Sequence, residues 1–264
     1  MTQPFSSPVF VPLPTFDLLG MRLAAVSAKE LLDHMFASLA RAQGGWIVTA
    51  NLDFLRRHAH DPEARDLYGA ADVCVADGMP LVWATRLQGD QLPERIAGSS
   101  LMLPIAERAA AEGRSIYLLG GEPAANEKAA AVLQARWPKL VIAGASSPMV
   151  KSPPSPADVQ ALREELLRAR PDVVLVGLGS PKQEQIIRAL RPELPRAWMI
   201  GVGMTFSFVA GTLSRAPAWM QRTGLEWCWR LGQEPRRLGR RYLLEDLPFS
   251  VELFARVAWK RLRS

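Results

Sequence analysis

Cysteine and histidine are scarce in this sequence, with only two cysteines and three histidines among 264 residues. Cys74 and Cys228 stand far apart, which excludes a disulfide framework and a zinc-binding cysteine spacing. Cys74 lies in an apolar run, so we expect a buried free thiol in a reducing compartment. The histidines show no metal-ligand spacing, and no Asp-X-Asp pair occurs in the chain. These absences favour a protein that uses neither a metal nor another cofactor.

Targeting features and long hydrophobic runs are missing as well. Residues 1–14 have no basic segment and are interrupted by four prolines, so we expect no secretory signal there. The longest nearly apolar run, residues 197–213, contains three glycines and three hydroxyl side chains. A membrane-spanning helix needs about 20 apolar residues, and this run begins like a buried strand. We therefore expect it in the core of the protein.

Positive charge is present but confined to one end of the chain. Residues 1–214 hold 21 Lys and Arg and 21 Asp and Glu, whereas residues 215–264 hold 11 and five and carry the whole net charge of +6. Four of the eight tryptophans also lie after residue 214. The contrast predicts a neutral core (1–214) and a basic, Trp-rich helical appendage (215–264). Such a segment attracts anionic lipid, diphosphate or nucleic acid, but no nucleic-acid-binding motif occurs, so nucleic acid is not expected.

Short β-branched runs alternate with helical patterns through the neutral part of the chain. The expected strands are 46–49, 73–76, 115–119, 140–143, 172–176 and 197–202. The expected helices are 28–41, 62–70, 99–112, 123–136, 156–169 and 182–190. This alternation predicts an α/β fold with βαβ units and a mainly parallel sheet, preceded by a small hairpin in residues 15–26.

The segment from Gly177 to Glu184 follows one of these strands and precedes a helix. Its glycines would let the backbone approach a phosphate at the helix N-terminus. The dinucleotide fingerprint is incomplete, because Lys182 stands where the third glycine belongs. The segment is thus a candidate for phosphate binding, and tight packing of the strand on the helix is an equal alternative.

Polar residues follow two other strands. Asp77 precedes Gly78 at the end of its strand, where a carboxylate could act as a general base, although Asp-Gly is also a common turn pair. Thr49 and Asn51 could bind a polar ligand, and Asn51 could equally cap the next helix. Because ligands of open parallel sheets bind beyond the carboxyl ends of the strands, we expect these residues at one site.

The basic segment ends in a helical pattern with two faces. From Phe249 onward, Glu252, Arg256, Lys260 and Arg263 fall on one side of a helical wheel. The opposite side carries Leu253, Phe254, Val257, Ala258 and Leu262. This pattern is typical of a helix in a membrane interface, and an ordinary helix covering the core is the alternative.

Seven motifs occur in the same order as in the WecG/TagA/CpsF glycosyltransferases, glycosyltransferase family 26, which the chain resembles over about residues 15–250. They are Trp46–Asn51, Ala76–Pro80, Pro93–Gly98, Leu118–Gly121, Val176–Glu184, Gly201–Gly203, and the tail motif Arg215–Trp219, Gly224–Trp227 and Gln233–Arg237. The resemblance implies a Rossmann-like sheet with helices on both faces and a C-terminal appendage. It also implies inverting, metal-independent transfer of a sugar from a UDP-sugar to a polyprenyl-diphosphate-linked sugar.

The resemblance also assigns residues. Asp77 looks like the general base, Thr49 and Asn51 like residues that hold the substrate sugars, and Gln183 like a donor-site residue. The full set of expected substrate-binding residues is Thr49, Asn51, Gly78, Arg95, Gly120, Gly121, Gly179, Ser180, Pro181, Lys182, Gln183 and Glu184. Arginines of the appendage reach the acceptor diphosphate in this family, and their spacing matches Arg230, Arg237 and Arg240.

The resemblance implies a peripheral protein on the inner face of the bacterial cytoplasmic membrane, active in cell-surface or exopolysaccharide synthesis. N-acetylmannosamine, its uronic acid and glucose all fit as the transferred sugar, and departures from the family pattern at Ser100, residues 144–149 and Ser207 bear on that choice. The sequence allows a homo-oligomer. The rival hypotheses are a nicotinamide-dependent oxidoreductase and a membrane-attached nucleotide-binding protein without catalytic activity.

Overall fold

The computed structural model of the chain describes residues 12–263, without the side chains of Ala218, Arg222 and Arg237. Its centre is a six-stranded sheet in the order β4-β3-β8-β7-β5-β6, and every neighbouring pair is parallel. The strands are β3 (Gly45–Ala50), β4 (Val73–Ala76), β5 (Ser115–Gly120), β6 (Val141–Ser146), β7 (Val173–Gly177) and β8 (Trp198–Gly201). The expected parallel α/β sheet is confirmed. The predicted hairpin is also present, as β1 (Thr15–Leu18) and β2 (Met21–Ala24).

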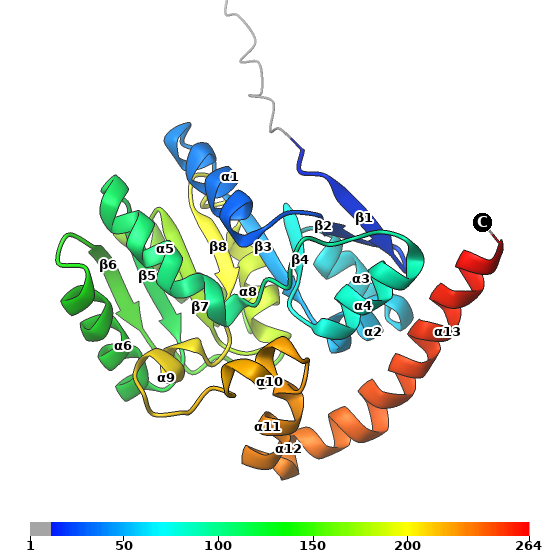
Figure 1. Ribbon diagram of the computed structural model, residues 1–264. Coiled ribbons are helices and arrows are strands. Elements are labelled where there is room, and N and C mark those ends of the chain that lie inside the picture. The colour runs from blue at the N-terminus through cyan, green and yellow to red at the C-terminus, as the bar shows by residue number, and fades with distance from the viewer. Residues whose placement is uncertain (1–11, 264) are drawn as a thin grey trace, which may run out of the picture.

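Side chains alternate between the two faces of the sheet, as the period of two in a strand requires. In β7, Val173 and Leu175 face one core, and Val174 and Val176 face the other. The first core is covered by α1 (Ala28–Ala40), α5 (Gly98–Glu112), α6 (Pro123–Arg136) and α9 (Thr205–Val209). The second is covered by α2 (Leu52–His60), α3 (Pro62–Gly69), α4 (Met79–Gln88), α7 (Pro156–Ala169), α8 (Lys182–Leu190) and a C-terminal helix. Helices on both faces make the fold Rossmann-like (Figure 1).

Helices α2 and α4 were missing from the expected set, and both bear on the site. Each begins at the carboxyl end of a strand: Asn51 is the N-cap of α2, and Gly78 is the N-cap of α4. Helix α2 has only nine residues, and the sequence indicated it only through Asn51 as a possible N-cap. Helix α4 begins at the Asp-Gly pair, which by itself favours a turn.

The basic segment folds into α10 (Ala218–Arg222), α11 (Glu226–Gln233), α12 (Pro235–Gly239), the π-helical segment η1 (Arg240–Asp246) and the long helix α13 (Leu247–Arg263). Helices α10 to α12 lie beyond the edge of the sheet toward which the strand arrows point (Figure 1). This is the edge where ligands of parallel sheets bind. Among residues 12–263, no helix combines the length and apolar character that a membrane-spanning segment requires.

The apolar face assigned to the last helix is divided: most of it packs on the core, as the alternative of an ordinary covering helix predicts, whereas Leu262 is exposed. Phe249, Leu253 and Val257 are buried, and α13 packs along α4. Burial of these three side chains against α4 removes apolar surface from water, which stabilises the docked position of α13. Leu262 forms an exposed apolar stripe with other residues of α13 and the end of η1, which we call the outer stripe: Leu244, Leu247, Val251, Trp259 and Leu262.

Both cysteines are free, as expected. Cys74 keeps some accessible surface, but burial raises the pKa of its thiol to about 12. The division of the chain between residues 214 and 215 stays a prediction. What the structure describes is a basic segment whose last helix shares a core with the sheet.

Candidate active site

The carboxyl ends of β3, β4 and β8 meet at one point. A Cβ atom on Gly98, the first residue of α5, would lie 2.9 Å from the carbonyl oxygen of Gly201 and 3.0 Å from Thr49 Oγ1. The backbone N–H of Asp77 donates to the carbonyl of Ala50 at 2.7 Å. This close packing, which only glycine permits at position 98, places Thr49 and Asp77 on the same small surface at the edge of the sheet.

Asn51 caps α2 and still presents part of its side chain to this edge. Its Oδ1 accepts hydrogen bonds from the backbone N–H groups of Asp53 (3.1 Å) and Phe54 (3.3 Å). The capping interpretation of Asn51 is therefore confirmed. The binding interpretation is compatible with it, because the cap uses Oδ1 and leaves Nδ2 as the donor that a substrate would meet.

Asp77 is the ionisable group at the centre of this surface. It keeps some accessible surface, and the N–H of Gly98 approaches its Oδ2 at 3.4 Å. Burial raises the pKa of Asp77 to about 7, while Arg95 acts to lower it and Glu226 acts to raise it. A carboxylate that exchanges its proton near neutral pH suits general base catalysis.

Arg95 connects Asp77 to the basic segment. Its Nη1 lies 2.9 Å from Oε2 of Glu226 in α11, and the two side chains are only 15% and 17% exposed. Glu226 was not among the expected site residues, although it lies within the Gly224–Trp227 motif. Because it comes from a segment far away in the sequence, only the fold brings its charge to Asp77.

The loop from Gly177 to Glu184 forms the other half of the site, after β7. A Cβ atom on Gly177 would lie 2.8 Å from the Phe206 ring and 2.9 Å from the carbonyl of Gly203, so this glycine serves packing. Gly179 has a φ of +76° with nothing within 4 Å of an added Cβ, so it serves the turn and leaves the backbone open. The packing alternative is thus confirmed at Gly177, and phosphate binding at the open backbone of Gly179 stays a prediction.

Three side chains of this loop already have partners. Gln183 is buried, donates to Glu184 Oε1 at 2.7 Å and accepts from the N–H of Gly203 at 3.3 Å. Burial raises the pKa of the Glu184 carboxyl, while the hydrogen bond from Gln183 acts to lower it. Lys182 donates to the carbonyl of Val150 at 3.1 Å. The roles of Gln183, Glu184 and Lys182 toward a donor stay predictions.

Gly120, Gly121 and the cis peptide bond between Ser180 and Pro181 lie at the same carboxyl edge of the sheet, after β5 and β7. The N–H of Gly121 donates to the carbonyl of Gly177 at 2.9 Å, and Gly120 packs against Gly177 and Leu178. Pro181 lines a cavity of about 490 Å³ between α3 and α8. Ser180, which precedes Pro181, has a buried hydroxyl that faces Tyr68 and Glu184 and acts to lower the pKa of both groups.

The three arginines expected at the acceptor diphosphate occupy different surroundings. Arg230, in α11, acts to lower the pKa of Asp77 and thus lies on the Asp77 side of the segment. Arg240 is 83% exposed and only approaches Glu245, at 3.7 Å. The side chain of Arg237 lies outside the described residues. Arg241, which follows Arg240, points inward, and its Nη2 lies 3.4 Å from Oδ1 of Asn51.

Within residues 12–263, no group of three or more His, Cys, Asp and Glu side chains is arranged to hold a metal ion. A metal-independent reaction stays a prediction. Comparison with known protein families bears directly on the reaction class. The family model described as the glycosyl transferase WecG/TagA/CpsF family matches residues 16–263, which is nearly the whole chain. The chain therefore belongs to the WecG/TagA/CpsF family of glycosyltransferases.

Proposed function

We propose that this glycosyltransferase transfers a sugar from a UDP-sugar to a polyprenyl-diphosphate-linked sugar, with inversion and without a metal. The observation that carries the proposal is Asp77, a carboxyl group with a pKa of about 7 that sits beside Arg95 at the carboxyl edge of the sheet. An acceptor hydroxyl that attacks an anomeric carbon must lose its proton. Asp77 is the group at this edge that takes that proton.

The departing UDP gains negative charge and needs compensation. Arginine side chains and backbone N–H groups supply it where no metal does. Arg95 and Arg230 lie near Asp77, and the loop around Gly179 offers open backbone before α8. We assign the donor diphosphate to the Gly179 loop and the acceptor diphosphate to Arg230, Arg237 and Arg240.

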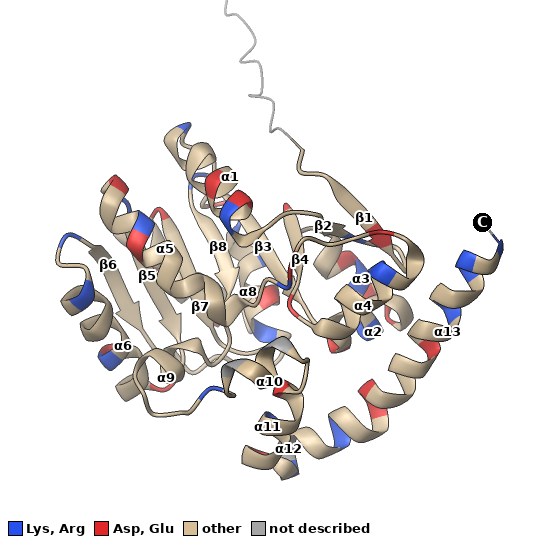
Figure 2. Cartoon of the chain, viewed as in Figure 1, with Lys and Arg blue, Asp and Glu red and all other residues tan. Residues whose placement is uncertain are grey.

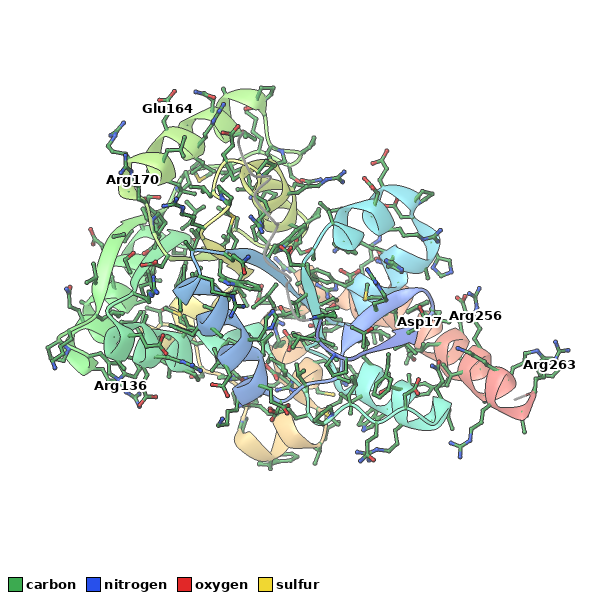
Figure 3. The ribbon with its side chains drawn as sticks, turned by 90° about the horizontal axis from the view of Figure 1, so that it is seen from above. Asp17, Arg136, Glu164, Arg170, Arg256 and Arg263 are labelled. Atoms are coloured by element: carbon green, nitrogen blue, oxygen red, sulfur yellow. The ribbon has the colours of Figure 1, made fainter. Side chains whose placement is uncertain are left out.

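The lipid-linked acceptor requires contact with a bilayer, and the outer stripe is suited to it. Val251 is 67% exposed and Leu262 is 83% exposed, and both lie on the side of α13 opposite Leu253. Basic positions concentrate toward the C-terminal end of the helix (Figure 2). Arg263 lies at that end, far from the sheet (Figure 3). Apolar area together with positive charge favours binding to an anionic membrane surface, as on the inner face of a bacterial membrane.

The test is turnover of a panel of UDP-sugars with short-chain polyprenyl-diphosphate sugars, for the wild type and for Asp77→Asn. We expect turnover by the wild type without added metal, and a loss of at least about 100-fold in Asp77→Asn, the size expected of a missing general base. Near-normal activity of that variant would remove Asp77 from its role. Panel members with N-acetylmannosamine, its uronic acid and glucose identify the sugar.

Ligand binding separates this proposal from an oxidoreductase. UDP at 100 times its dissociation constant adds about 2.7 kcal/mol to stability and raises the melting temperature accordingly. Stabilisation by NAD and none by UDP, measured with EDTA present, would refute the proposal.

A further inference from the structure

Helix α2 and the segment η1 are joined by a compact set of alternating charges, which we call the α2–η1 cluster. Its members are Asp53, Arg56, Arg57, Arg241, Glu245 and Asp246. Three positive and three negative side chains balance one another. Asp53 and Asp246 are almost fully buried, with side chains 1% and 8% exposed. The cluster lies next to Asn51, because Asp53 is in the first turn of α2.

Asp53 is the centre of the cluster. Arg56 Nη2 lies 2.7 Å from its Oδ1, Arg57 binds its Oδ2, and Arg241 approaches the same Oδ2 at 3.6 Å. Burial acts to raise the pKa of Asp53, but Arg57, Arg241 and Arg56 outweigh it and hold the pKa below its usual value. Asp53 is therefore ionised at neutral pH, and its negative charge attracts the side chain of Arg241 from η1 toward α2.

Arg241 contacts the proposed site at Asn51. Its Nη2 lies 3.4 Å from Asn51 Oδ1, the same oxygen that accepts the N–H groups of Asp53 and Phe54. On its other side, Nε of Arg241 lies 3.4 Å from Asp246. Three donors thus meet one amide oxygen, which fixes the orientation of the amide and keeps Oδ1, rather than Nδ2, turned toward α2 and Arg241.

We propose that Arg241 is a positioning residue that fixes the side-chain amide of Asn51 for the sugar substrate, and so couples docking of the C-terminal segment to the site. The proposal rests on the glycosyltransferase function proposed above. A guanidinium suits this place because its planar fork reaches Asn51, Asp53 and Asp246 together, whereas a lysine ammonium is a single point of charge. The π-helical form of η1 fits as well, since such segments occur often at functional sites.

The test uses Arg241→Lys, Arg241→Ala and Asn51→Ala, singly and combined. We expect each Arg241 variant to lower kcat/KM for the UDP-sugar by roughly 10- to 100-fold, the size of a small misplacement of a binding group. Affinity for UDP, which lacks the sugar, should stay within about threefold of the wild type. In the Asn51→Ala background the Arg241 substitutions should cost less than about threefold, because residues that act as a unit are not additive.

A readout independent of turnover keeps the proposal separate from the proposed function. In protein labelled with ¹⁵N-asparagine, the side-chain amide signal of Asn51, identified by its loss in Asn51→Ala, should move in Arg241→Lys. The matched control is Arg163→Ala, which removes an arginine paired with Glu193 at 2.8 Å on α7, far from Asn51 in the chain. It should leave that signal and kcat/KM unchanged.

Two results would overturn the positioning role. One is an Asn51 amide signal that stays in place in folded Arg241→Lys, whatever the activity of the protein. The other is an Arg241 effect of equal size with and without Asn51. Loss of UDP affinity and of melting temperature in parallel with activity would instead assign Arg241 a purely structural role. If the wild type shows no transferase activity while the Asn51 signal still moves in Arg241→Lys, the proposed function is refuted and the contact between Arg241 and Asn51 stands.

Discussion

The protonation state of Asp77 links its surroundings to the rate of the proposed reaction. A general base must be ionised, and the pKa of Asp77 is about 7, because burial and Glu226 raise it more than Arg95 lowers it. We predict that kcat/KM rises about tenfold per pH unit below pH 7 and levels off above it. Replacing Glu226 by Gln should move this profile to lower pH, since it removes a negative charge and frees Arg95. A profile that stays in place would exclude Glu226 from tuning Asp77.

The same pKa predicts a change in stability. The folded pKa of about 7 lies above the ordinary value of 3.8, so between these two pH values the folded protein holds a proton that the unfolded chain releases. The contribution of Asp77 to stability is therefore full below pH 4 and is lost as the pH rises through 7. Asparagine is neutral throughout. Asp77→Asn should melt about 2–4 °C higher than the wild type at pH 8, if it recovers about 1 kcal/mol, and the difference should be smaller at pH 5, where only part of the contribution is lost.

Melting curves at both pH values check this prediction. A variant that melts lower than the wild type at pH 8 would show that ionised Asp77 is stabilised by its partners rather than strained by burial. The comparison between variant and wild type isolates Asp77 from other titrating groups, such as Glu184, because those groups are common to both proteins.

Single residues differ in how far the sequence predicted them. The positions of Asp77, Thr49 and Asn51 at one edge were predictable, because each lies at or just after the end of a recognisable strand and parallel strands end on the same side. The choice between Arg240 and its neighbour Arg241 was not, since both are arginines in a run of basic residues. The helical backbone turns one outward and the other toward Asn51. That direction depends on where η1 docks.

At the scale of an element, α13 shows why an apolar pattern can be assigned to the wrong surroundings. The helix carries apolar residues on two sides, and the wheel identifies a face without naming what covers it. Leu253 is buried in the core that α13 shares with α4, whereas Leu262, near the C-terminal end of α13, is exposed. The side of the helix that meets α4 is decided by packing of the whole molecule.

We predict that Leu253→Ala lowers the free energy of unfolding by about 2–5 kcal/mol, because it leaves a cavity between α13 and α4. Leu262→Ala, at the exposed end of the same helix, should change it by less than about 0.5 kcal/mol. Denaturant unfolding of both variants measures the difference. Equal effects would mean that α13 does not pack on α4 in solution.

At the scale of the whole molecule, the basic segment is both a part of the core and a neighbour of the site. Phe249 and Leu253 pack with the sheet-side helices, Glu226 pairs with Arg95, and Arg241 reaches Asn51. Removal of residues after 213 would therefore expose α4 and disturb the site together. Substitutions on the outer stripe test membrane attachment without this complication.

We predict that Val251→Glu combined with Leu262→Glu weakens binding to phosphatidylglycerol vesicles by at least about tenfold, since it replaces apolar contacts by negative charge. The melting temperature should stay within about 2 °C of the wild type, because both side chains are exposed. Val132→Glu, an exposed substitution on α6, is the matched control. Vesicle binding of the double variant equal to the wild type would place the membrane contact elsewhere on the protein.

The sequence by itself determined the strands, most of the helices, the parallel sheet and the edge where the candidate site residues gather. These follow from local periodicity and from the rule that parallel strands end on the same side. The tertiary structure alone decided which face of α13 is buried, which arginine points inward, and that Glu226 stands beside Arg95 and Asp77. These depend on contacts between residues more than 100 positions apart, and the docking of the C-terminal segment sets them all at once.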